Sequence, residues 1–148
     1  MFKRILVAVD ASETGEQALQ MAIGLATESQ AQLRIVHAVD VSNVNMESEQ
    51  LDHSAMTEKI KKNGQDTLSN AEMKAAAAGI EAETNLVVLE TLKPRIAEAV
   101  IEDAEAWPAD LIVIGTHGRR GLSRLVVGSV AEGIVRGATM PVLLTRGT

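Results

Sequence analysis

The residues of this chain that are best suited to chemistry lie at 111–130, in the stretch LIVIGTHGRRGLSRLVVGSV. The aliphatic residues 111–114 are typical of a parallel strand buried on both faces, and Gly115 ends that strand where the backbone turns or is closely approached. Gly128 and Ser129 stand at the start of a pattern with helical spacing. Because the first turn of a helix leaves backbone N–H groups unpaired at the positive end of its dipole, this order predicts an anion site.

The loop between this strand and this helix carries glycines and positive charges. The residues concerned are His117, Gly118, Arg119, Arg120, Gly121 and Arg124. In an arbitrary α/β protein such glycines are often turn residues alone, and loop arginines are ordinarily solvated. Near a triphosphate the arginines could instead steer the ligand and neutralise its charge.

No familiar catalytic arrangement is present in the sequence. The lysine of a Walker motif is missing, there is no G-x-S-x-G elbow, and no histidine is spaced convincingly beside a serine nucleophile and an acid. We therefore predict no catalytic residues. No metal cluster is visible either, and because the glycine loop has no carboxylate, phosphate oxygens would hold most of any divalent ion.

Hydrophobic periodicity predicts that strands and helices alternate along the whole chain. The predicted strands span 3–9, 32–39, 81–89, 110–114 and 142–145, and the predicted helices follow a Ser12 cap and span 55–78, 94–107 and 129–137. Residues 40–54 have no period and predict a loop. We expect Gly79 to cap the second helix, Pro94 to begin the third and Pro141 to open the last strand. Gly64, inside the second helix, should cost about 1 kcal/mol relative to Ala.

The composition indicates one α/β domain. The chain has 148 residues, which is the size of a single domain, and 46% of them are hydrophobic, although Phe2 and Trp107 are its only aromatic residues. An aliphatic composition of this kind suits a parallel sheet. Alternating strands and helices predict that this sheet is open, with right-handed crossovers and helices on both faces.

Charge and hydropathy exclude several classes of partner. The net charge of −6 and the scarcity of aromatic residues argue against nucleic acid. No apolar run approaches the roughly 20 residues of a membrane span, and residues 5–9 are too few for the core of a signal peptide. The chain has no Cys, which fits a reducing compartment. We therefore expect a soluble cytoplasmic protein with no membrane partner.

The glycine spacing resembles that of a known family. Gly115-x2-Gly118-x9-Gly128-Ser129 is similar to the nucleotide-binding signature G-x2-G-x9-G-(S/T) of the universal stress protein family, in its ATP-binding branch. KRILVAVDASE resembles the family's first strand with its terminal Asp, and PADLIVIG resembles its fourth. The resemblance covers residues 1–148 and implies one universal stress protein (Usp) domain. Its implied fold is adenine-nucleotide alpha-hydrolase-like, with a single five-stranded parallel sheet in the order 3-2-1-4-5.

The same resemblance implies a nucleotide site at the carboxyl ends of the first and fourth strands, where the strand order reverses. Its residues would be Ala8, Val9, Asp10, Ala38, Ile114, Gly115, His117, Gly118, Arg119, Gly128, Ser129 and Val130. By resemblance, ribose would approach Gly115, the phosphates would lie on Gly118 and on residues 128–130, and the main chain at Ala38 would read the adenine edge. Asp10 either binds the ribose or base, or caps the turn that follows it.

Three functions remain open for such a domain. The first is a stress-response regulatory module that binds ATP or another adenine nucleotide, with or without Mg, and hydrolyses it little or not at all. The second is a slow ATPase or phosphotransferase on the same site, and the third is a nucleotide-free dimeric interaction module. The resemblance favours the first. It also implies a homodimer through Val142 to Thr145, because an uncovered apolar edge strand invites pairing with a second copy.

Overall fold

The structure is a computed structural model that describes residues 1–10, 13–42, 53–116 and 128–146. Strands and helices alternate along these residues as the periodicity predicts. They are β1 (Arg4–Ala8), α1 (Glu13–Ser29), β2 (Gln32–Asp40), α3 (His53–Ala77), β3 (Glu83–Leu89), α4 (Ile96–Ala106), β4 (Leu111–Gly115), α5 (Ser129–Gly137) and β5 (Val142–Thr145). The strands form one parallel sheet in the order β3-β2-β1-β4-β5, which confirms the predicted fold class and strand order.

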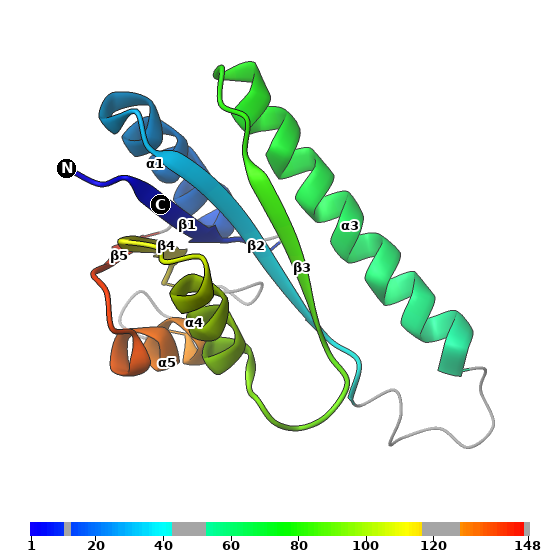
Figure 1. Ribbon diagram of the computed structural model, residues 1–148. Helices are drawn as coiled ribbons and strands as arrows, with labels where there is room; N and C mark the ends of the chain where they lie inside the picture. The colour runs from blue at the N-terminus through cyan, green and yellow to red at the C-terminus, as the bar shows by residue number, and fades with distance from the viewer. Residues whose placement is uncertain (11–12, 43–52, 117–127, 147–148) are drawn as a thin grey trace.

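Helices cover both faces of the sheet (Figure 1). Helices α1 and α3 pack over one face, on residues that include Ile5, Val7 and Ile35, whereas α4 and α5 pack over the other, on Leu6 and Ile112. Successive side chains of a strand point to opposite faces, so both cores draw on the same aliphatic runs. The central strands β1 and β4 are accordingly buried on both faces, as their unbroken hydrophobic sequences predict.

Helix α3 ends in a Schellman motif. Ile80 N–H donates to the Ala75 carbonyl and Gly79 N–H donates to the Ala76 carbonyl, both at 2.9 Å. Gly79 has a φ of +83°, a conformation that favours glycine because it has no Cβ. The predicted C-terminal cap is therefore confirmed, and it satisfies carbonyls that the end of the helix would leave unpaired.

The predicted start of α4 at Pro94 is wrong. Arg95 has an extended backbone, with a ψ of 166°, and its N–H donates to Glu98 Oε1 at 3.4 Å. Arg95 is thus the residue that caps the helix, which begins at Ile96. The predicted loop at 40–54 is also too long, because Asp40 ends β2 and α3 begins at His53. Residues 43–52 of that loop lie outside the described residues.

Helix propensity alone suggested that Gly64 is less favourable than Ala, but the packing of α3 at this position favours glycine. It is buried inside α3, where the helix packs on β2 and β3. A Cβ on Gly64 would lie 2.8 Å from Leu86 Cδ1, 3.0 Å from Val39 Cγ1 and 3.4 Å from His37 Cδ2. The glycine therefore allows the helix to approach the sheet closely, and a larger residue would have to displace one of these side chains.

We expect Gly64→Ala to lower the free energy of unfolding by about 1 to 3 kcal/mol, the usual cost of overpacking, although Ala is the better helix former. Gly24 is the matched control, because it is exposed inside α1 and nothing outside its own helix lies within 4 Å of where its Cβ would be. Gly24→Ala should raise the same free energy by about 0.5 to 1 kcal/mol. Denaturant unfolding measures both values, and equal stabilisation by the two substitutions would contradict the close approach at Gly64.

A polar network lies near the amino-terminal ends of the strands, on the face that α4 covers. Arg34 of β2 donates to both carboxylate oxygens of Asp103 on α4, from Nε at 2.8 Å and from Nη2 at 3.0 Å. Asn85 of β3 donates to Asp103 Oδ1 at 2.8 Å, and Glu83 Oε1 lies 3.5 Å from Arg34 Nη1. The hydrogen bonds with Asp103 raise the pKa of Arg34 against the opposing effect of burial. The network ties α4 to the two strands.

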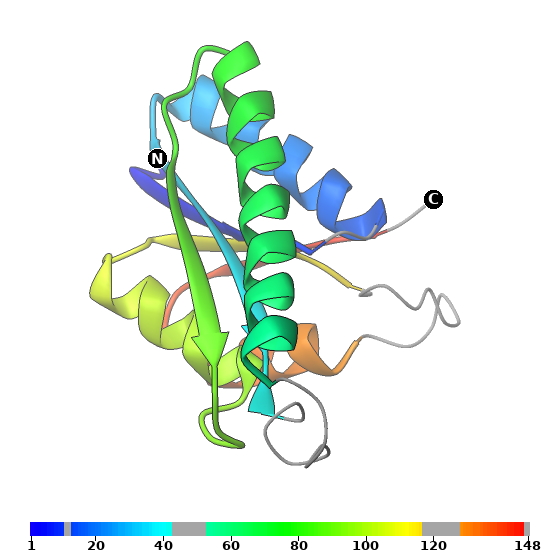
Figure 2. The ribbon, with the colours of Figure 1, turned by 90° about the vertical axis from the view of Figure 1, so that its right-hand side faces the viewer.

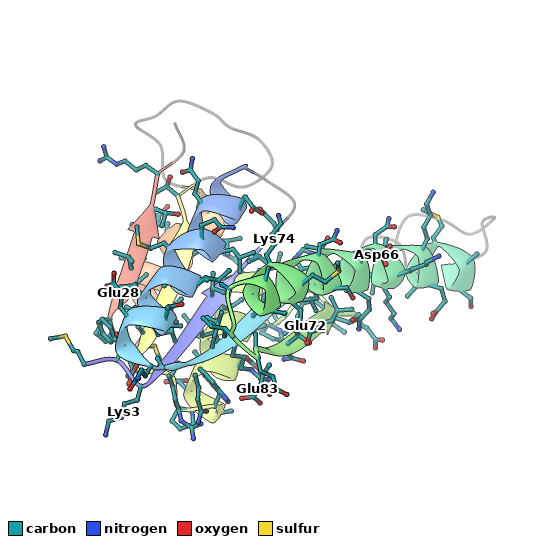
Figure 3. The ribbon with its side chains drawn as sticks, turned by 90° about the horizontal axis from the view of Figure 1, so that it is seen from above. Lys3, Glu28, Asp66, Glu72, Lys74 and Glu83 are labelled. Atoms are coloured by element: carbon teal, nitrogen blue, oxygen red, sulfur yellow. The ribbon has the colours of Figure 1, made fainter. Side chains whose placement is uncertain are left out.

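On the opposite face, an ion pair joins α1 to α3. Lys74 Nζ of α3 donates to Glu16 Oε2 of α1 at 2.6 Å, and Figure 3 shows Lys74 between the two helices. This hydrogen bond is the main cause that lowers the pKa of the Glu16 carboxyl. Because both side chains remain nearly half exposed, solvent screens the pair and its contribution to stability is small.

Candidate functional site

A cavity of about 390 Å³ opens where β1, β2 and β4 end and α5 begins. Its volume is typical of sites that bind small molecules. Of the predicted site residues, those that line it are Ala8, Val9, Asp10, Ala38, Ile114, Gly115, Gly128, Ser129 and Val130. The other predicted residues, His117, Gly118 and Arg119, lie outside the described residues, as do Arg120 and Arg124.

The strand order explains where this cavity lies. The chain passes from β1 to β2 and β3 on one side of the sheet and to β4 and β5 on the other, so the crossovers diverge at β1 and β4. A crevice at the carboxyl ends of two such strands is the usual ligand site of an open parallel sheet. Figure 2 shows the carboxyl end of β4 and the first turn of α5 on the same side of the molecule.

One part of the cavity is apolar. Its walls are formed by Ala8, Val36, Ala38, Ile96, Val100, Ile114 and Ala131. Ile96 and Val100 lie one turn apart at the start of α4 and so share a face of that helix. Neither residue was among the predicted site residues, because apolar residues at helical spacing do not by themselves indicate a ligand site. Their place in the cavity wall follows from the packing of α4 beside the ends of the strands.

The first turn of α5 forms the polar part of the cavity. Gly128 is its N-cap, with φ −62° and ψ 157°, and the first intrahelical hydrogen bond runs from Glu132 N–H to the Gly128 carbonyl. Within the described structure, no acceptor is found for the N–H groups of the three residues between them, 129–131. An anion in front of this turn would face those donors at the positive end of the helix dipole.

The backbone amide of Gly128 already has a hydrogen-bond partner in the structure. Its N–H donates to the Thr116 carbonyl at 2.6 Å, and Thr116 N–H donates to the Thr145 carbonyl at 2.9 Å. The Gly128 amide is therefore used to hold the start of α5 against the end of β4. The available amides begin one residue later, at Ser129, and extend to Ala131, which was not among the predicted site residues.

Asp10 lies between the cavity and the start of α1. A Cβ on Gly15 would be 2.6 Å from Asp10 Oδ1 and 3.1 Å from the Asp10 backbone nitrogen and oxygen, so the first turn of α1 is packed directly against this residue. Asp10 also lines the cavity. The position of the carboxylate is compatible with both interpretations of its role, as a cap and as a ligand of ribose or base. The sequence alone did not identify Gly15.

Two polar residues in the cavity wall were also missed. Thr116 is buried just after β4, and His37 is buried within β2 with its Nδ1 2.6 Å from the Val9 carbonyl oxygen. The described part of the lining has a carboxylate, at Asp10, but neither lysine nor arginine. Among the described residues, no group of three or more His, Asp or Glu side chains could hold a metal ion, and no helix is long and apolar enough to cross a membrane.

Comparison with known sequences identifies relatives that span the whole chain. The profile of the universal stress protein family matches residues 1–146. The chain is 34% identical over 153 aligned residues to the universal stress protein YxiE of Bacillus subtilis, an alignment that covers 99% of this chain and 100% of that protein. It is 33% identical over 146 residues to a universal stress protein of Methanocaldococcus jannaschii, with 99% and 83% covered.

Solved structures with the same fold include relatives with bound nucleotides. A protein of the universal stress protein family from Burkholderia pseudomallei has 31% identity and a TM-score of 0.78, with 97% of this chain and 95% of that chain covered. A universal stress protein in complex with cAMP has 24% identity and a TM-score of 0.73, with 99% of each chain covered. The universal stress protein of Archaeoglobus fulgidus in complex with dAMP has 25% identity and a TM-score of 0.67, with 96% of each chain covered.

Proposed function

The chain belongs to the universal stress protein family, and from this premise we propose that it binds ATP or another adenine nucleotide in the cavity between β1, β4 and α5. In this proposal it is a cytoplasmic stress-response module that signals through its bound state. The observation that carries the proposal is the combination, in one cavity, of an apolar part and a helix start whose amides have no acceptor among the described residues.

The apolar part of the cavity suits an adenine base. Neither Phe2 nor Trp107 is part of the lining that the structure describes, so the base would lie between aliphatic groups such as Ala8, Val36 and Val100. Burial of the base there would be driven by loss of apolar surface from water, which specifies little by itself. Its identity would be read by backbone groups at Ala38, with Asp10 placed to accept hydrogen bonds from ribose or from the base amino group.

The phosphates would lie at the first turn of α5. The N–H groups of residues 129–131 and the Ser129 hydroxyl would donate to phosphate oxygens, and Gly115 would leave room for the ribose. A divalent ion bound with the nucleotide would be held mainly by phosphate oxygens. The relatives in complex with cAMP and dAMP support an adenine nucleotide as the ligand class, although neither of these ligands is a triphosphate.

Slow turnover is part of the proposal. Phosphoryl transfer needs a group that positions the attacking water and usually a cation that stabilises the transition state. The described part of the lining has no lysine or arginine for the second role, which leaves Arg119, Arg120 and Arg124 as candidates in the sequence. We therefore expect the bound nucleotide to be hydrolysed slowly or not at all, and the protein to act through occupancy of the site.

Mass spectrometry of small molecules released by denaturing the freshly purified protein tests the ligand class without a prior choice of ligand. Calorimetric titration with ATP and Mg, after any co-purified nucleotide is removed, tests the affinity. We expect an adenine nucleotide in the first measurement and saturable binding with thermal stabilisation in the second. Absence of heat and of stabilisation would favour the dimeric interaction module, whereas turnover faster than about one per second would favour an enzyme.

We further propose that the protein forms a homodimer through β5, which is an edge strand of the sheet. The Pro141 carbonyl accepts a hydrogen bond from Ile112 of β4, and the Thr145 carbonyl accepts one from Thr116, the residue after β4. By alternation, the backbone groups of Val142 and Leu144 point away from the sheet. A second copy related by a two-fold axis could pair with those groups and close both edges.

Leu144→Pro removes one outward N–H and should shift the protein to monomer, because proline cannot donate to a strand across the edge. Leu144→Val keeps the N–H and a side chain that favours strands, so it should remain dimeric. Sedimentation velocity compares the two variants with the wild type, and circular dichroism checks that each is folded. A proline variant that sediments as a dimer would exclude this edge as the interface.

A further inference from the structure

His37 makes a hydrogen bond at the point where β1 and β2 stop pairing. Its Nδ1 lies 2.6 Å from the Val9 carbonyl oxygen, and the imidazole is buried. A carbonyl oxygen can only accept, so Nδ1 carries the proton and donates it. Helix α3 packs close to the ring at Gly64, because a Cβ built on this glycine would lie 3.4 Å from His37 Cδ2. The imidazole therefore has one well-defined place, against the end of β1.

The ladder between the two strands shows which backbone groups of β2 point toward β1. Gln32 N–H donates to the Lys3 carbonyl and Val9 N–H donates to the Val36 carbonyl, both at 2.9 Å. Backbone groups of successive strand residues point in opposite directions within the sheet. The even-numbered residues of β2 therefore direct their N–H and C=O groups toward β1, and the odd-numbered residues direct theirs toward β3.

Ala38 is the next even-numbered residue, and its expected partner is already engaged. The register that pairs Ala8 with Val36 would, if continued, place a hydrogen bond from Ala38 N–H to the Val9 carbonyl. The described structure has no such bond, and the His37 side chain donates to that carbonyl instead. As a result the backbone edge of Ala38, which lines the cavity, is not closed by β1.

We propose that His37 is a positioning residue that keeps the backbone of Ala38 available to the base of a bound nucleotide. The inference rests on the proposed function, because it assigns His37 a role in the same site. Adenine presents a ring-nitrogen acceptor beside an amino donor, which complements the N–H and C=O of one strand residue. Without the imidazole, the Val9 carbonyl would accept a hydrogen bond from the Ala38 N–H. The pairing of β1 with β2 would then include Ala38, and its backbone would no longer be available to the base.

Two substitutions separate this role from general packing. His37→Leu removes the donor and keeps an apolar side chain in the core. His37→Asn keeps a donor, because its amide nitrogen is attached at the same distance along the side chain as Nδ1 and can reach the Val9 carbonyl. The asparagine variant should therefore behave as the wild type in every measurement below, and the leucine variant should not.

The first measurement is amide exchange by NMR in the nucleotide-free protein. We expect the Ala38 amide of the wild type to exchange at least about tenfold faster than that of Val36, which is paired with β1, since exchange reports whether the N–H is bonded. In His37→Leu the Ala38 amide should become as slow as the Val36 amide. An Ala38 amide as slow as Val36 in the wild type would overturn the proposal whatever the protein binds.

The second measurement compares ATP with tripolyphosphate, a probe that has no base. His37→Leu should weaken ATP binding by about tenfold or more, the loss of one to two hydrogen bonds, and leave tripolyphosphate binding unchanged. Equal weakening of both ligands, or of neither, would refute the role of His37 while ATP binding by the wild type stands. A wild type that binds neither ligand would refute the proposed function itself, and the base-reading role with it.

Discussion

Ser129→Pro should weaken ATP binding by between about a hundredfold and about ten-thousandfold, whereas Ser129→Ala should weaken it by about ten- to a hundredfold. Alanine removes only the hydroxyl, which is one hydrogen bond to a charged phosphate, worth roughly 1.5 to 3 kcal/mol. Proline also removes the backbone N–H at the first position of α5. The difference between the two variants therefore measures the amide that the helix start would offer to phosphate.

The helix should survive the proline. Ser129 is the first residue of α5, the position where proline is best tolerated because its missing N–H has no partner within the helix. A proline also requires the residue before it to be extended, and Gly128, with ψ 157°, already is. Calorimetric titration gives the affinities, and circular dichroism with thermal unfolding shows whether each variant is folded. If the proline variant bound ATP as tightly as the alanine variant, the Ser129 amide would not contribute to phosphate binding.

Asp103→Ala should lower the free energy of unfolding by about 2 to 3 kcal/mol, because it leaves the Arg34 guanidinium largely buried without its main partner. The side chains of Arg34 and Asp103 are 18% and 13% exposed, and Glu83 remains 3.5 Å from Arg34, so the cost stays below that of a fully buried pair. An arginine side chain stays protonated in proteins even without a partner, so the variant cannot relieve the cost by deprotonation. The melting temperature should fall by roughly 5 to 10 °C.

Glu102→Ala is the control for this substitution. Glu102 precedes Asp103 on α4, is exposed, and carries the same charge, so its removal should change stability by no more than about 0.5 kcal/mol. The network lies at the end of the sheet opposite the cavity, so neither substitution should change the affinity for ATP. Equal melting temperatures for the two variants would show that the Arg34–Asp103 pair contributes little to stability.

Much of the candidate site could be predicted from its sequence because its parts are local. The run 111–114 forms a buried strand, Gly115 ends it, and Ser129 begins a helix, each through the conformational preferences of neighbouring residues. The same locality explains the correct cap at Gly79. The twelve-residue site prediction also relied on the glycine spacing, which reflects a family pattern, and whether those residues bind a nucleotide stays a prediction.

Other features of the structure depend on contact between residues distant in the sequence. Helix propensity alone made Gly64 a weak point, but its environment is set by Leu86 and Val39 on two strands. Residues 128–130 were predicted to hold the phosphates. The partner of the Gly128 amide, the Thr116 carbonyl, becomes its neighbour only in the folded chain, where the end of β4 meets the start of α5. Ile96 lines the cavity only because α4 packs beside the ends of the strands, and nothing in its own segment marks it as a site residue.

The sequence by itself determined which segments are strands and helices, that the sheet is parallel and aliphatic, and that a glycine and a serine stand at a helix start. These properties depend on φ/ψ preferences and on the period of hydrophobic residues, both of which act over a few residues. The tertiary structure alone decided that His37 takes the Val9 carbonyl, and that Asp103 pairs with Arg34. Such pairings depend on the register of strands and the docking of helices, which join residues far apart in the chain and leave no mark in any local pattern.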